Sequence, residues 1–366
     1  MNNKTTYFYL LDAIRGAAAL IVVVRHTSYF FGWALPMSHL AVDLFFMLSG
    51  VVIANAYEAR LQAGLPPGRF MLIRLIRLYP FYLLGSVLGL VPVLAARSGL
   101  AAEGFQDDLS WTLGAAMLML PTLSGADLYP LDTPAWSLFF ELVANLFYAL
   151  ILRSLSGRLL LILILLCAVG LALVLGVTPG HSLHGGFSPA TMPAGAFRVG
   201  FSFFVGVALY RHGHGVRNAA LSAGDSARMP AVLLVGVVAA LLVASPPASL
   251  RAVYELLTVT ALFPLLIGLA MRCPLSGSGA RWATVLGTLS YPVYVLHVPV
   301  ARTLNGVLGK GLHMPVEHWA PYAGLVFLAL FLPACLLADR WYDGPARARL
   351  GSLLLPKLSK LPGQSG

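Results

Sequence analysis

The sequence has few charged side chains. Only 10% of its 366 residues are Asp, Glu, Lys or Arg, whereas 58% are hydrophobic. A soluble domain carries about 25% charged residues, because its surface must be hydrated. This chain therefore has too few charged side chains to hydrate the surface of a soluble globular protein.

Cysteine and acidic residues are scarce as well. The three cysteines, Cys167, Cys273 and Cys335, lie in or beside apolar runs. We therefore expect neither a disulfide framework nor a metal site. Lysine and arginine outnumber acidic residues by 24 to 14, for a net charge of +10. In membrane proteins such an excess lies in cytoplasmic loops and fixes orientation, so we expect no nucleic-acid partner.

Long apolar runs are abundant instead. Crossing a bilayer takes about 20 apolar residues in a helix, and a helix satisfies its own backbone hydrogen bonds in lipid. The sequence therefore predicts an all-α, polytopic membrane helical bundle of about ten transmembrane helices. The expected spans are residues 10–31, 39–57, 79–96, 134–153, 158–177, 195–211, 229–245, 252–271, 283–303 and 319–338.

One apolar stretch, residues 111–123, is too short for an ordinary span. If it does not cross, the basic ends of the spans all fall on one side, and the acidic residues Glu103, Asp107 and Asp108 fall on the other. The positive-inside rule then places both termini in the cytoplasm. The first run lacks a cleavage site, so we expect it to remain in a bacterial-type inner (plasma) membrane.

Four titratable residues are predicted at similar depth near the outer face. These are His26, Asp43, Glu141 and His297, each four to seven residues from the outer end of its predicted span. Charged groups in a span are costly and are usually functional or paired. We expect Asp43 to orient His26 as a general base. A purely structural link between the first two spans is the alternative.

Arginines gather on the cytoplasmic side. Arg74 and Arg77 share a helical face just before Pro80, which we expect to open the third span, and Arg15 ends the first span on the same side. Such a cluster binds either lipid head groups or the phosphates of a soluble donor. The residues alone leave both interpretations open.

Arg15 and His26 are eleven residues apart, about 16 Å along one helical face. A donor with a phosphate-rich head and a long thin arm, such as acyl-coenzyme A, would fit that distance. This hypothesis requires both side chains to open toward one shared cavity.

Five motifs occur in order along the chain. They are LDAIRGAAALIVVVRH, AVDLFFMLSG, RLIRLYPFY, PAWSLFFE and SYPVYVLHVP. Together they resemble the acyltransferase-3 family of integral membrane O-acyltransferases in its stand-alone form, over about residues 8–340. The resemblance makes residues 1–345 one transmembrane domain and residues 346–366 a basic cytoplasmic tail.

The resemblance implies acyl transfer, most often of acetyl, from cytoplasmic acyl-CoA to a hydroxyl of a cell-surface or lipid-linked glycan. His26 would be the base, and Arg15, Arg74 and Arg77 the donor-binding residues. The expected partners are the donor, the glycan acceptor and membrane lipids, with no metal. Glu141 and His297 would lie in or behind the acceptor pocket.

Other roles were weighed for the same residues. A proton-coupled transporter or flippase would also hold intramembrane histidines and carboxylates, but internal repeats are absent from the sequence. Arg25, Trp136 and Tyr291 are alternative oxyanion donors. Gly50 is expected to permit close helix packing. Surface positions are expected for the loop histidines His181, His184, His212, His214, His313 and His318.

Overall fold

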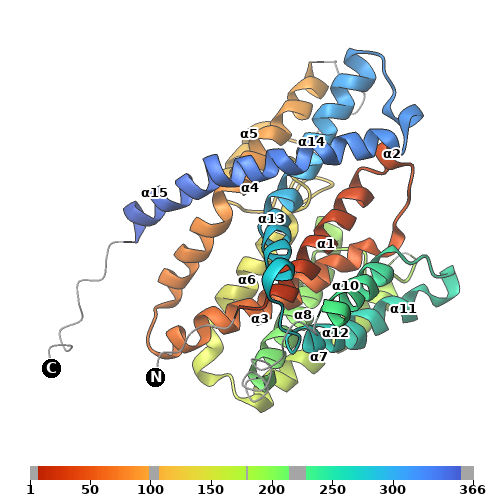
Figure 1. Cartoon of the computed structure of the whole chain (residues 1–366). Helices are drawn as coiled ribbons and strands as arrows, with labels where there is room; N and C mark the ends of the chain where they lie inside the picture. Colours follow the sequence, from red (N-terminus) through yellow and green to blue (C-terminus); the bar gives the residue numbers. More distant parts are fainter. Residues whose placement is uncertain (1–6, 99–106, 179, 214–227, 356–366) are drawn as a thin grey trace.

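The structure is a computed structural model that describes residues 7–98, 107–178, 180–213 and 228–355. Every regular element in these ranges is a helix, which confirms the predicted all-α bundle (Figure 1). Glu103, His214 and the last part of the predicted tail, residues 356–366, lie outside the described residues.

Eight of the described helical segments are long and apolar enough to cross a membrane. They contain α3 (Ala41–Gln62), α4 (Pro67–Arg97), α6 (Ala135–Ile151), α7 (Gly157–Val177), α8 (Met192–His212), α11 with α12 (Arg251–Leu257 and Phe263–Ala270), α13 (Gly277–Gly306), and α14 with α15 (Tyr322–Ala338 and Gly344–Leu354). Large apolar side chains such as Leu165 and Leu330 are exposed on them, as lipid contact requires.

Two further helices coincide with predicted spans. α1 (Tyr9–His26) has 18 residues and contains Asp12, Arg15 and Arg25, so its charge content is high for a span. α10 (Arg228–Val243) has 16 residues. With these two, every one of the predicted spans is occupied by a helix. α15 also runs through residue 346, where the tail was predicted to begin.

The ambiguous segment at 111–123 forms only a short helix. α5 (Leu109–Met117) has nine residues, which is about 14 Å of helix, less than half of the bilayer core. It therefore cannot span as a helix, in agreement with the non-crossing interpretation.

α4 is longer than the third span that the sequence predicts. It begins at Pro67 and has 31 residues, and Pro80 lies inside it. The expectation that Pro80 opens this helix was therefore wrong. Because one continuous helix carries Arg74, Arg77 and the apolar span, the arginines are held rigidly against the bundle.

Glycines bring two pairs of helices into close contact. α1 and α13 cross at Gly16 and Gly287, where a Cβ would lie 2.6 Å from Leu286 and 2.7 Å from Asp12 (Figure 1). α3 and α8 meet at Gly50 and Gly206, and a Cβ at Gly50 would lie 2.1 Å from the Phe203 carbonyl oxygen. The packing role expected for Gly50 is confirmed. These crossings fix the distances between polar side chains on the four helices.

Candidate active site

Two cavities adjoin α1, one at each end of its polar face. The first has a volume of about 550 Å³ and the second about 220 Å³. His26 lines the first, and Arg15 lines the second. One continuous helix therefore carries both residues, as predicted, with His26 at its end and Arg15 eleven residues before it.

The two imidazoles of His26 and His297 are in contact. His26 Nδ1 lies 3.0 Å from His297 Nε2 and 3.1 Å from the Val22 carbonyl oxygen. His297 Nδ1 faces the carbonyl oxygens of Val293 and Tyr294 at 3.1 and 2.8 Å. A carbonyl oxygen can only accept, so His297 carries its proton on Nδ1 and its Nε2 accepts.

These contacts fix the tautomer of His26. Because His297 Nε2 accepts, His26 Nδ1 must donate, and a neutral His26 therefore has a free lone pair on Nε2. The His26 side chain is exposed where it lines the first cavity. The pair thus presents an unprotonated imidazole nitrogen, oriented by hydrogen bonds, as a general base requires.

Asp43 has a different partner from the one expected. Both of its carboxylate oxygens accept from Arg198, the shortest contact being 2.6 Å from Nη2, and both side chains are buried. The predicted hydrogen bond between Asp43 and His26 was wrong. Asp43 acts on the cavity indirectly, because its partner Arg198 lines it.

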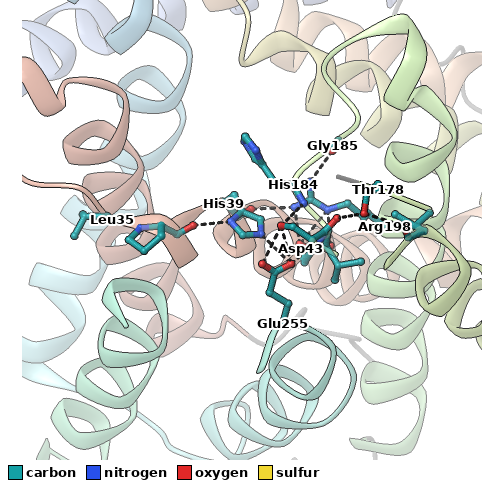
Figure 2. A network of polar contacts seen from close by, with 12 residues as sticks. Leu35, His39, Asp43, Thr178, His184, Gly185, Arg198 and Glu255 are labelled. Atoms are coloured by element: carbon teal, nitrogen blue, oxygen red, sulfur yellow. Dashed lines mark hydrogen bonds and ion pairs between the residues drawn. The ribbon is translucent and has the colours of Figure 1, made fainter. Parts of the chain in front are cut away.

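Arg198 is the centre of a polar network behind the first cavity (Figure 2). It donates to the carbonyl oxygens of Gly185 and His39 at 2.8 and 2.9 Å, and its guanidinium lies over the Trp136 ring. His39 Nε2 is 3.4 Å from Glu255 Oε2. The network joins α3, α8, α11 and the loop after α7. Sequence analysis missed Arg198, although an arginine inside a span was a signal.

Glu255 closes the network from α11. Its carboxylate accepts from the Ser182 hydroxyl at 2.9 Å and from the Leu183 backbone N–H at 2.6 Å. Glu255 is fully buried, but these contacts and the nearby His39 ring compensate its charge. It supports the wall of the cavity without lining it.

The loop after α7 brings His184 into the first cavity. His184 Nε2 lies 3.2 Å from Arg25 Nη2. The residue is exposed in a loop, as predicted, but it lines the first cavity instead of an open surface. Burial, followed by repulsion from the imidazole of His39 and the guanidinium of Arg25, lowers the pKa of His184 to about 3. His184 is therefore neutral near pH 7.

The second cavity gathers the three predicted donor-binding arginines. Arg15, Arg74 and Arg77 all line it. Each has a carboxylate partner: Arg15 binds Asp12 at 2.9 Å, Arg74 binds Glu141 at 2.7 Å, and Arg77 lies 3.6 Å from Asp343. These three ion pairs hold the arginines in place and balance their charge. An anion that binds the arginines would have to replace the carboxylates as their partners.

Glu141 belongs to this second cavity. Its Oε1 accepts from Arg74 Nη2 and from the Ser49 hydroxyl, both at 2.7 Å. The prediction that Glu141 converges with His26 was wrong, because α4 carries Arg74 deep enough to meet it. Of the four groups expected together, only His26 and His297 are in contact.

Tyr294 lines both cavities and lies between them. Its hydroxyl is 2.7 Å from Ser137 Oγ, and its ring meets the Phe45 ring edge-on. The single shared cavity expected for Arg15 and His26 is therefore replaced by two cavities that meet at one side chain. In the part of the chain that the structure describes, no group of three metal-binding side chains occurs.

Comparison with known proteins identifies the family. The family model described as "Acyltransferase domain", that of the acyltransferase-3 family, matches residues 8–338. "Protein 2 in picA locus" of Rhizobium radiobacter is 45% identical over 159 residues, which cover 39% of this chain and 81% of that protein. No solved structure matches the chain. The chain therefore belongs to the acyltransferase-3 family and is a multi-pass membrane acyltransferase.

Proposed function

We propose that the protein moves an acyl group, in the first instance acetyl, from cytoplasmic acyl-CoA to a hydroxyl of a cell-surface or lipid-linked glycan. It would act in a bacterial-type inner membrane with both termini in the cytoplasm. The observation that carries the proposal is the placement of a hydrogen-bonded His26–His297 pair and an arginine cluster at the two ends of α1.

His26 is the proposed general base. Its Nε2 takes the proton of the acceptor hydroxyl while that oxygen attacks the thioester carbonyl, and a new C–O bond forms. The C–S bond then breaks, and the proton on His26 passes to the departing thiolate, so that free CoA leaves. His297 keeps Nδ1 of His26 engaged throughout, which holds the reacting nitrogen toward the cavity.

The second cavity is the proposed donor site. At about 220 Å³ it lies below the range of about 300–1,000 Å³ that is usual for drug-sized ligands, so it suits the thin thioester-bearing arm. Arg15, Arg74 and Arg77 would bind the phosphates at its cytoplasmic mouth. Arginine suits this role because its planar fork binds phosphate oxygens in pairs.

Tyr294 must move for the thioester to reach His26. It is the side chain common to both cavities, so rotation of its ring away from Ser137 would join them. Of the oxyanion donors considered, Tyr291 donates to the Leu78 carbonyl oxygen and lines the second cavity. Trp136 and Arg25 line the first cavity and remain as donors.

Family membership sets aside the transporter and flippase alternatives. The test of the proposal is transfer of labelled acetyl from acetyl-CoA to membrane glycans by purified protein in nanodiscs. His26→Ala should abolish transfer and leave acetyl-CoA affinity unchanged. The matched control is His318→Ala, which alters an exposed histidine outside both cavities. Transfer by His26→Ala at the parental rate would refute the mechanism.

A further inference from the structure

The first cavity has an excess of positive charge that its own walls do not balance. Three guanidiniums line it, those of Arg25, Arg198 and Arg302, against one carboxylate, that of Asp127. The charge of Arg198 is compensated by Asp43 behind the wall. Arg25 and Arg302 remain to be accounted for.

The hydrogen-bond partners of Arg25 are neutral, and the more distant carboxylate of Glu255 attracts its charge. Its Nη1 donates to the carbonyl oxygens of Leu35 and Pro36 at 2.9 and 3.2 Å, and its Nη2 is beside neutral His184. Among the described residues no carboxylate lies within 4.0 Å of it. Carbonyl oxygens satisfy the N–H groups but leave the unit charge, and a charge removed from water is normally paired.

Arg302 is only weakly compensated. Its Nη2 lies 3.5 Å from the Thr133 hydroxyl, which in turn is 3.4 Å from Asp127 Oδ2. Asp127 lies in the loop before α6; burial raises the pKa of its carboxyl, and the guanidinium of Arg302 lowers it. The side of the cavity between the two arginines therefore favours an anion.

We propose that the acceptor carries an anionic group, a carboxylate or a phosphate on the sugar, and that Arg25 binds it with Arg302 providing further attraction. This rests on the proposed function in so far as the first cavity receives the acceptor. A guanidinium recognises both groups through paired, charge-assisted hydrogen bonds. The Trp136 N–H then remains for the oxyanion.

The wall is built to hold Arg25 in this position. Leu35 precedes the helical turn Pro36–Leu40, which Pro36 begins and which contains His39. The His39 carbonyl oxygen accepts from Arg198, and its ring lies near Glu255. Through Leu35 and Pro36, Arg25 is thus held by the same network that supports the cavity. A preorganised guanidinium loses little entropy when an anion binds.

Binding without any acyl donor tests the proposal. Saturation-transfer NMR titrations of the protein in phosphatidylcholine nanodiscs would use D-glucuronate, D-glucose 1-phosphate and D-glucose as probes. At least one charged sugar should bind about tenfold more tightly than glucose, and the tighter of the two identifies carboxylate or phosphate as the source. Equal affinity for all three sugars would overturn the proposal.

Variants separate charge from structure. Arg25→Gln should remove the preference for the charged sugar, whereas Arg25→Lys should keep part of it. Arg281→Gln, an exposed residue outside both cavities, should not change it. A uniform loss of affinity for all three sugars in Arg25→Gln would show a merely structural role and would also overturn the proposal.

The failure of this proposal can be distinguished from failure of the proposed function. His26→Ala should retain the preference for the charged sugar, because His26 acts on the hydroxyl and not on the anion. If transfer occurs but no charged sugar is preferred, the acceptor is neutral and the transferase mechanism stands.

Discussion

His26 and His297 are hydrogen-bonded partners at 3.0 Å, although 271 residues separate them in the chain. The close crossing of α1 and α13 at Gly16 and Gly287 brings them together. The proposed base is therefore oriented by a second imidazole, itself anchored to the backbone, rather than by a carboxylate.

The role of His297 as a hydrogen-bond acceptor is testable. His297→Ala should lower the transfer rate about 100-fold, within the range of general acid–base effects, because His26 Nδ1 loses the imidazole acceptor and keeps only the Val22 carbonyl oxygen. His297→Gln should retain more activity, since its amide oxygen can accept the same hydrogen bond. Steady-state kinetics with acetyl-CoA would measure this. Equal rates for the two variants would contradict the proposed orientation.

The arginine cluster should determine donor affinity. Arg74→Gln should raise the Kd for acetyl-CoA about tenfold, which corresponds to the loss of about 1.4 kcal/mol from a charge-assisted contact. Arg60→Gln is the control, because Arg60 lies over the Tyr57 ring at the end of α3 and does not line the second cavity. Calorimetry in nanodiscs measures both. An unchanged Kd for Arg74→Gln would favour lipid anchoring.

Tyr294 should limit the acyl groups that pass between the cavities. Tyr294→Ala should raise the rate with butyryl-CoA relative to acetyl-CoA at least about tenfold, because the separating ring is removed. Tyr294→Phe keeps the ring and loses only the hydroxyl, with its contacts to Ser137 and to the Pro134 carbonyl oxygen, so it should keep the chain-length preference. The same ratio in both variants and the parent would show that Tyr294 does not divide the path.

The α3–α8 crossing should be intolerant of a methyl group. Gly50→Ala places a Cβ 2.1 Å from the Phe203 carbonyl oxygen, so the helices must separate, at a cost of about 1–3 kcal/mol. Gly176→Ala adds the same methyl on α7 with nothing within 4 Å and should not destabilise the protein. Thermal unfolding in detergent compares them. Equal Tm values would contradict the close contact.

His184 predicts how stability depends on pH. Its pKa is about 3 when folded, against 6.5 for the free side chain. Between these values the unfolded chain binds a proton that the folded protein does not, so stability falls as pH drops below about 6.5. The Tm of His184→Gln should therefore fall less than the Tm of the parent protein between about pH 7 and about pH 5. An equal decrease in both proteins would contradict the assignment.

Much of the fold followed from apolar length, because the bilayer requires helices of a known size. Apolar length did not predict which polar side chains contact each other. Counting residues from the end of a span gives depth but not the direction of a side chain, so Asp43 was assigned to His26 when its true partner is Arg198. Glu141 was misassigned because α4 extends beyond its apolar portion and carries Arg74 to it.

The relative placement of Arg15 and His26 followed from the sequence, since one helix fixes their spacing. His26 is the last residue of α1, Arg15 lies eleven residues before it, and each lines a cavity. His184 was missed because its position depends on a loop folded against α11 through Glu255, a long-range contact without a local pattern.

In the proposed mechanism, the single helix α1 sets a fixed distance between the arginines that would bind the phosphates and the nitrogen of His26 that would react. A donor with phosphates but a shorter arm would be bound by the arginines, and its thioester would not reach His26. A thioester donor without phosphates would not be held by the arginines in a position to reach His26. The length of α1 therefore constrains the length of the donor coenzyme and not the acyl group that it carries. A change of acyl group would then need fewer changes to the protein than a change of coenzyme.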